Sequence, residues 1–382
     1  MLSAALVASL VGFGSTVALV LAAAKALGAD PAQTSSWILA ICLAKAIGSI
    51  WLSRWSRVPV VLAWSTPGAA LLAASTGFTI NQAVTAFVVA GLLLLATGAF
   101  KPLGRVIAMI PEGIAAAMLA GVLLPFCLHG TQAAQAAPLM VVPMIATFLL
   151  IRLWQPGLAV LAALGIGLII AFATSAAHLP AIGLPLPQLT FIAPDWSLPA
   201  LLGLGLPLYI ATMASQNLPG FAVLRAAGYE PPVERALMVT GGLSALSGLF
   251  GAHSVNMAAI TAAICINDDV HPDRNQRWKV GVAYGVMWMI LGLISPLLIQ
   301  LLEALPPQVM TALVALALLG PLMGAMTGAF LPVPTRFAAV VTLAVTASGL
   351  VIWGLGAPIW GLGAGLLVHL LDQAKARLKA GV

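Results

Sequence analysis

Two stretches decide the fold of this chain: Val58–Ala74, which reads VPVVLAWSTPGAALLAA, and Gly248–Cys265, which reads GLFGAHSVNMAAITAAIC. Each begins with β-prone residues that favour an extended backbone, meets a small polar cluster, and continues as an alanine-rich segment that favours a helix. In the first stretch Ser65 and Thr66 are good N-cap residues, and Pro67 suits the first helical position. We therefore predict a short extended strand followed by a half-helix.

The second stretch predicts the same arrangement, because Ser254 and Asn256 could cap a helix that runs to about Ala262. A helix that begins inside a membrane leaves its first N–H groups without water. Such a start is tolerated where it faces protein or a wet cavity, and its partial positive charge suits an anion. Two such starts at corresponding places in one chain predict a transporter substrate site between them.

The composition places the chain in a membrane. Of its 382 residues 62% are hydrophobic and only 7% are charged, whereas a soluble domain carries about 25% charged residues. We therefore expect an all-α polytopic membrane protein in contact with the lipid bilayer. The net charge of +6 does not indicate a nucleic-acid partner, because its distribution along the chain follows the membrane segments.

Fourteen apolar segments follow one another along the sequence. They lie near residues 3–26, 34–53, 58–76, 81–99, 107–127, 137–151, 157–177, 199–222, 236–249, 250–266, 280–300, 307–326, 338–353 and 358–371. If the N-terminus is cytoplasmic, all 16 Lys and Arg residues except Lys25 and Lys45 fall in cytoplasmic connections, as the positive-inside rule requires. Both termini are then cytoplasmic.

The two broken segments are the third and the tenth in this order. Residues 1–178 and 198–372 therefore form two seven-segment repeats, and the odd number of crossings inverts the second repeat relative to the first. Inverted repeats of this kind place the substrate near the middle of the bilayer, and alternating access follows from movement of one part against another.

Segment eight carries a dense polar patch at membrane depth. Thr212, Ser215 and Gln216 recur at helical spacing, so we expect all three on one face, with Asn217 beside them. These side chains could bind a substrate next to the half-helices. Hydrogen bonding between packed helices is the alternative.

Ionisable residues inside a membrane are costly, and few occur here. His253 precedes the second half-helix, so it could carry a coupled proton, bind substrate, or be a hydrogen-bonded buried histidine. Lys45 lies in the middle of segment two, where it could attract an anion, snorkel to the interface, or bond a carbonyl group. We interpret Glu112, at the start of segment five, as an interfacial residue.

Aromatic residues lie near both breaks, and Trp64, Tyr209 and Phe250 could pack against a planar apolar ligand or simply against their neighbours. The charged loop Asn267–Lys279 has no zinc-type spacing. We expect no metal, no cofactor and no enzymatic activity, because the sequence offers no nucleophile, acid–base pair or ligand cluster.

Five stretches resemble the benzoate transporter (BenE) family: RVPVVLAWSTPGAALL (57–72), MASQNLPG (213–220), AAGY (226–229), AAITAAIC (258–265) and HPDRNQRW (271–278). They span both halves in one order. The family is similar in architecture to uracil permease and sulfate transporters. This resemblance implies a core domain from segments 1–4 and 8–11, and a gate domain from segments 5–7 and 12–14 through which relatives commonly form homodimers.

The resemblance also implies proton-coupled uptake of benzoate across the bacterial inner membrane. The site positions that match the family are Ser65, Thr66, Gly68, Ser215, Gln216, Asn217, Ser254 and Asn256. We expect the benzoate carboxylate to lie between the two helix N-termini and the ring to lie against Trp64, Tyr209 or Phe250. A proton would compensate the charge of the anion, with His253 or the substrate as its carrier.

Two other transport functions remain open from the sequence. The first is an exchanger or channel of the same fold that carries inorganic anions. The second is a nucleobase-type permease. Uracil permease binds its uncharged base with acidic residues in segments eight and ten, where this chain has neutral ones, so the second function has less support.

Overall fold

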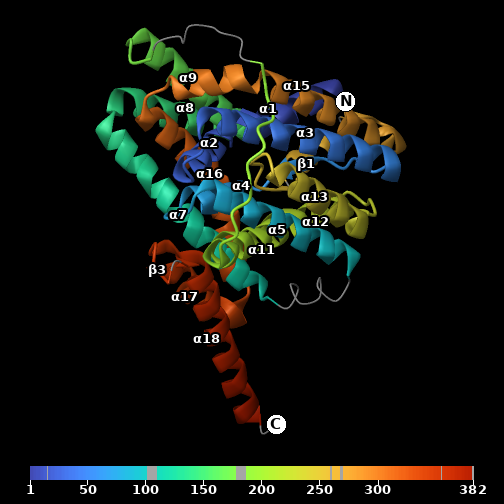
Figure 1. Cartoon of the computed structure of the whole chain (residues 1–382), viewed down its shortest axis with the longest axis vertical. Coiled ribbons are helices and arrows are strands. Elements are labelled where there is room, and N and C mark those ends of the chain that lie inside the picture. Colours follow the sequence, from blue (N-terminus) through green and yellow to red (C-terminus); the bar gives the residue numbers. More distant parts are fainter. Residues whose placement is uncertain are drawn as a thin grey trace.

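The chain is mostly helical (Figure 1) in a computed structural model, which describes residues 1–14, 16–100, 110–177, 186–258, 260–266, 270–353 and 355–380. Each of the predicted apolar segments contains at least one helix. Eight helical stretches within the described residues are long and apolar enough to cross a membrane, and two shorter apolar helices accompany them. The predicted cytoplasmic residues Lys101 and Arg105 lie outside the described ranges.

The elements before the central connection are α1 (Leu2–Gly14), α2 (Val17–Ala26), α3 (Pro31–Ser56), β1 (Leu62–Trp64), α4 (Thr66–Ala73), α5 (Ile80–Ala99), α7 (Glu112–Ala136), α8 (Pro138–Trp154) and α9 (Ala159–Ala173). Those after it are α10 (Leu198–Ala200), η2 (Leu201–Gly205), α11 (Leu206–Thr212), η3 (Met213–Asn217), α12 (Leu218–Ala226), α13 (Val233–Gly248), β2 (Val255–Met257), α14 (Ile260–Ile266), α15 (Trp278–Glu303), α16 (Pro307–Phe330), α17 (Arg336–Ala347), β3 (Val351–Ile352), β4 (Leu355–Gly356) and α18 (Ala357–Ala380).

The two broken segments meet in the interior as a two-stranded antiparallel sheet. β1 pairs with β2 in a register that places Leu62 opposite Met257, and Trp64 opposite Val255. Each strand then leads into a short helix, α4 or α14. The sequence predicted an extended stretch before each half-helix. β1 lies within the first, whereas β2 lies at Val255–Met257, where a helix cap was predicted. Each strand supplies hydrogen-bond partners for the other where water is absent.

Side chains of neighbouring helices satisfy the outward-facing backbone groups of this sheet. Ser49 of α3 accepts a hydrogen bond from the Leu62 N–H (3.0 Å), and Tyr284 of α15 donates to the Leu62 carbonyl (2.9 Å). Ser244 of α13 accepts from the Val255 N–H (2.8 Å) and donates to the Val255 carbonyl (3.2 Å). The sheet is thus hydrogen bonded from both of its edges.

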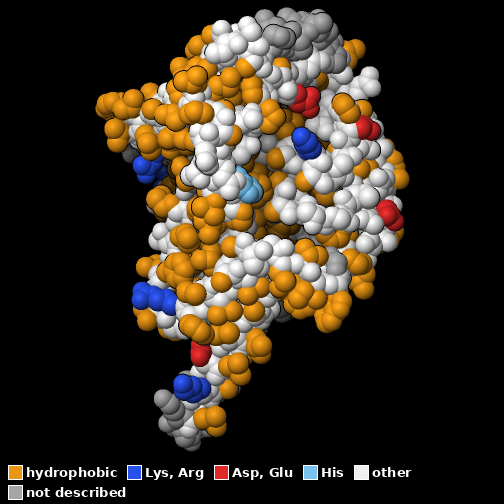
Figure 2. Space-filling view, turned by 90° about the vertical axis from the view of Figure 1, so that its left-hand side faces the viewer, with side chains coloured by type: hydrophobic (Ala, Val, Ile, Leu, Met, Phe, Trp, Pro, Cys, Tyr) orange, Lys and Arg blue, Asp and Glu red, His pale blue; other side chains and the backbone are white. Residues whose placement is uncertain are grey.

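The helices of the first half pack mainly on helices of the second half. Helix α3 lies along α15, α5 along α13, and α7 along α16. Close contact between α5 and α13 requires glycine, because a Cβ atom at Gly91 would lie only 2.5 Å from the backbone nitrogen of Ala245. Apolar side chains gather over the left-hand and lower parts of the face shown in Figure 2, which suits contact with lipid.

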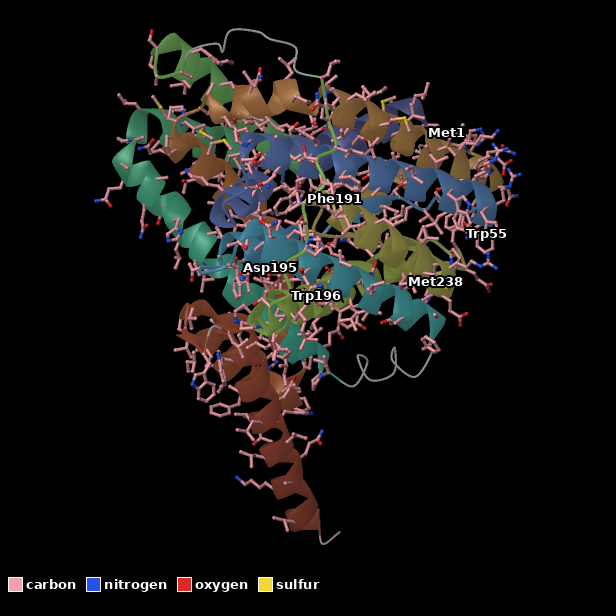
Figure 3. All side chains as sticks on the ribbon, in the orientation of Figure 1. Met1, Trp55, Phe191, Asp195, Trp196 and Met238 are labelled. Atoms are coloured by element: carbon pink, nitrogen blue, oxygen red, sulfur yellow. The ribbon has the colours of Figure 1, made fainter. Side chains whose placement is uncertain are left out.

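The connection between the halves crosses the body as an extended segment, along which Figure 3 labels Phe191, Asp195 and Trp196. Its backbone is hydrogen bonded at several points, since Asn81 of α5 donates to the Ala193 carbonyl (2.8 Å) and accepts from the Asp195 N–H (3.1 Å). This segment therefore ties both halves together.

We expect Ser49→Ala and Ser244→Ala each to lower the free energy of unfolding by about 1–3 kcal/mol, because each leaves a strand N–H unpaired in the interior. Thermal unfolding in detergent micelles would measure the loss. Ser35→Ala is the matched control, since Ser35 lies on α3 and its hydroxyl makes no hydrogen bond with a described residue. Equal melting temperatures for all three variants would contradict the proposed role of the two serines.

Candidate functional site

A cavity of about 420 Å³ lies beside the paired strands. Its walls come from α1, α3, β1 and α4 in the first half and from η3, α14 and α15 in the second, and α7 and α16 close it on another side. The lining side chains that carry a polar atom are Thr16, Lys45, Trp64, Thr66, Glu112, Ser215, Gln216, Thr261 and Tyr284. Most of the remaining lining residues are Ala, Gly and Pro, so the cavity is apolar with a few polar groups.

The start of α4 forms one end of the cavity, where Thr66 and Pro67 line it. Ser65 is the N-cap, as the sequence predicts, and its hydroxyl accepts a hydrogen bond from the Gly68 N–H (3.0 Å). Thr66 is therefore the first helical residue rather than a cap, and Pro67 is the second. Ser65 and Gly68 hold this helix end together and do not line the cavity.

The second break differs from its prediction. Ser254 and Asn256 do not cap a helix, because Asn256 lies in β2 and α14 begins only at Ile260. With its amide oriented to satisfy both atoms, Asn256 accepts a hydrogen bond from the Ser65 N–H (2.8 Å) and donates to the Met257 carbonyl (3.0 Å). Strand pairing keeps this stretch extended longer than local capping preferences suggest. Ser254 is buried, and its hydroxyl has no hydrogen-bond partner among the described residues.

The polar patch of segment eight lies on η3, a turn of π-helix. The wider turn separates residues that α-helical spacing would place on one face. Ser215 and Gln216 line the cavity, whereas Thr212 is buried away from it. Asn217 points toward β2 and accepts a hydrogen bond from the Met257 N–H (2.9 Å). The predicted patch therefore divides into two residues at the cavity, one that supports the sheet, and Thr212, which is buried and does not line the cavity.

Among the predicted aromatic residues, Trp64 lines the cavity and the other two do not. The Trp64 indole N–H donates to the Thr16 hydroxyl (2.6 Å), which fixes the ring. Tyr209 is buried and shares a hydrogen bond with Thr97 (2.5 Å). Phe250 packs against Phe191 of the connecting segment, with 6.4 Å between ring centroids.

His253 is fully buried, is not among the cavity-lining residues, and is hydrogen bonded through both ring nitrogens. Its Nδ1 accepts from the Trp37 indole (3.1 Å), and its Nε2 lies 3.0 Å from the Ser65 carbonyl oxygen. These contacts assign the neutral tautomer with the proton on Nε2. A second proton on Nδ1 would face the Trp37 N–H, so the observed contacts suit a residue that joins α3, β2 and the start of α4.

The sequence did not predict several of the residues that line the cavity. Tyr284 reaches the cavity from α15, and Thr261 reaches it from α14. Helix α16 contributes Gly320, Gly324 and Gly328, and their four-residue spacing was the one available signal. Such spacing is common where membrane helices pack closely. A Cβ atom at Gly320 or Gly324 would meet no atom within 4 Å, so these two glycines leave space for the cavity.

The arrangement suits binding rather than covalent chemistry. The described residues contain no cluster of three or more His, Cys, Asp or Glu side chains that could hold a metal ion. The cavity volume lies within the range of roughly 300–1,000 Å³ that is typical of small-molecule sites. Its aromatic lining residues Trp64 and Tyr284 and its few polar groups fit a small, mostly apolar molecule with a polar end.

Solved structures show the fold to which this arrangement belongs. The chain is similar to the transmembrane domain of the cyanobacterial bicarbonate transporter BicA, with a TM-score of 0.59 and 15% identity, over 95% of this chain and 97% of that one. It is also similar to SLC26A9, with a TM-score of 0.66 and 13% identity, over 97% of this chain and 64% of that one. These identities support the fold alone.

Sequence comparisons give the family. Residues 1–371 match the family described as benzoate membrane transport protein, BenE. The chain is 39% identical to the inner membrane protein YdcO of Escherichia coli strain K12, over 95% of this chain and 93% of that protein. It is 30% identical to the benzoate membrane transport protein of Acinetobacter baylyi, over 96% of this chain and 94% of that protein. The chain belongs to the BenE family, whose members are membrane transport proteins and not enzymes.

Proposed function

We propose that this protein imports benzoate, or a related aromatic carboxylate, together with a proton by alternating access. The cavity carries this proposal, because it combines an indole wall at Trp64 with the polar groups of Thr66, Ser215 and Gln216. An aromatic ring would lie along Trp64 and the alanine-rich wall, and the carboxylate would lie near the start of α4. The name of the relative from Acinetobacter baylyi supports the choice of benzoate.

The transport cycle that we propose uses fourteen membrane segments arranged as two inverted repeats. The antiparallel pairing of β1 with β2 supports this arrangement, since corresponding strands of two inverted repeats run in opposite directions. We place the core in segments 1–4 and 8–11 and the gate in segments 5–7 and 12–14. The cavity supports this division, because α7 and α16 of the gate face the broken segments across it. Dimerisation through the gate is part of this proposal.

We propose a bacterial inner membrane location with both termini in the cytoplasm, from the distribution of Lys and Arg. An inside-negative potential opposes entry of an anion by about 2.3 kcal/mol per charge per 100 mV. One proton carried with one benzoate removes that cost, because the pair crosses the membrane without net charge. An exchanger of inorganic anions is the second candidate, favoured by the fold it shares with a bicarbonate transporter. The largely apolar lining of the cavity favours an aromatic acid over an inorganic anion as the cargo.

Uptake of radiolabelled benzoate into proteoliposomes tests the function. We expect accumulation above equilibrium under an inward proton gradient, and collapse of that accumulation when a protonophore is added. Gln216→Ala should reduce the initial rate at least about tenfold, because the loss of one charge-assisted hydrogen bond costs about 1.5–3 kcal/mol. Gln135→Ala, at an exposed position of α7, should transport like the wild type.

Protein-free liposomes must be measured in parallel, because benzoic acid crosses lipid unaided. Uptake no faster than in those liposomes would rule out benzoate as the substrate. Accumulation of bicarbonate or sulfate that is indifferent to the proton gradient would favour the anion exchanger instead.

We expect Gly324→Leu to abolish most benzoate uptake, because the new side chain would occupy cavity space where a Cβ meets no atom within 4 Å. Protein stability should not fall, since replacing a helical glycine gains about 1 kcal/mol of helix propensity. Gly363→Leu on α18 is the matched control, as this glycine also has open space around it but does not line the cavity. Wild-type rates for Gly324→Leu would show that cargo does not occupy this part of the cavity.

A further inference from the structure

Lys45 lies in the middle of α3 and is only 1% exposed, yet its side chain lines the cavity. Its Nζ atom lies 2.9 Å from the ring centroid of Trp288 and 4.3 Å from that of Trp64. The side chain does not snorkel to an interface. Its amino group is therefore held beside Trp64, the residue just before the Ser65 N-cap of α4, where we place the carboxylate of the cargo.

No described residue neutralises this amino group, since Lys45 forms no hydrogen bond or ion pair within the described part of the chain. The titratable groups around it are Cys42 on α3, Tyr284 on α15, His253 before β2, and Glu112 across the cavity on α7. The Tyr284 hydroxyl is bonded to a strand carbonyl, both nitrogens of His253 are bonded, Glu112 is exposed, and Cys42 is a buried free thiol. None of them is a counter-ion for a lysine cation.

A buried ammonium without a counter-ion is unfavourable by several kcal/mol. The indole faces of Trp64 and Trp288 attract a cation, but such contacts stabilise it by only about 0.5–2 kcal/mol. The neutral amine carries no such cost. An anion that enters the cavity would therefore favour the ammonium, and a proton on the amine would favour the anion.

The start of α4 cannot supply this compensation by itself. Its Gly68 N–H is bonded to Ser65, and Pro67 has no N–H. The Thr66 N–H is the single donor of that first turn without an acceptor among the described residues. One neutral donor leaves most of the charge of a carboxylate unmatched. The Lys45 amino group is the cation that the cavity offers.

We propose that Lys45 accepts the coupling proton and that its ammonium then holds the carboxylate of the cargo. This inference rests on the proposed function. In the step, the lone pair of the neutral amine binds one proton, and the resulting ammonium pairs with one carboxylate, so the cavity gains no net charge. Proton and cargo each raise the affinity for the other by the same factor. The empty carrier returns with the neutral amine.

The proposal sets the sign of the pH dependence. Binding of benzoate consumes a proton, so its affinity should fall as the pH rises, by up to about tenfold per pH unit. A pH-indicator dye in weakly buffered detergent solution would report uptake of one proton for each benzoate bound by the full-length wild type. Benzamide, the uncharged analogue, should bind without proton uptake. Benzoate binding without proton uptake overturns the proposal.

Lys45→Arg tests the role of the residue, because a guanidinium keeps its charge at every accessible pH. This variant should bind benzoate with an affinity independent of pH and without proton uptake. In proteoliposomes it should exchange external for internal benzoate but fail to accumulate benzoate under a proton gradient. Protonophore-sensitive accumulation by Lys45→Arg overturns the proposal. Lys25→Met, at an exposed lysine of α2, should behave like the wild type.

Lys45→Met decides the question if the arginine variant does not fold, because methionine can pack between the two indoles. It should bind benzoate at least about tenfold more weakly than the wild type and should prefer benzamide over benzoate. If Lys45 had only a structural role, its substitution would not reverse the preference between benzoate and benzamide. An unchanged preference for benzoate overturns the role of Lys45. Failure of the wild type itself to bind or transport benzoate is a distinct result, which overturns the proposed function.

Discussion

The fold depends on one constraint, that two strands inside a membrane protein must find hydrogen-bond partners for every backbone group. Pairing of β1 with β2 satisfies the inner groups. Ser49 and Ser244, one from each half of the chain, satisfy the outer N–H groups of the two strands. Tyr284 and Asn217 add bonds from α15 and η3. The helices that carry these side chains are thereby fixed around the sheet, and the cavity forms beside it.

This support has a consequence for the cavity, because many of the polar groups near the breaks are used to hold the strands. Asn256, Asn217 and His253 all bond to backbone of the broken segments or of the residues next to them. The polar groups left facing the cavity are few and mostly neutral. A charged cargo therefore depends strongly on Lys45, whose amino group the two indoles position without neutralising it.

Both halves of the chain line the same cavity, because helices of one half pack against helices of the other. Helix α3 contacts α15, α5 contacts α13, and α7 contacts α16. The cavity lies between broken segments that hold one another through hydrogen bonds and the helices α7 and α16, whose lining residues are mainly small.

The sequence by itself determined the membrane class, the helical segments, the first extended break with its Ser65 cap, and the family, because hydropathy, N-cap chemistry and motif order are local properties. It also predicted Trp64, Thr66, Ser215 and Gln216 as substrate-binding residues, and all four line the cavity. Only the tertiary structure decided that Asn217 and His253 face the sheet, and that α14 starts after β2. It alone brought Lys45 between two indoles, because that contact joins α3, β1 and α15, and no local pattern encodes the packing of distant helices.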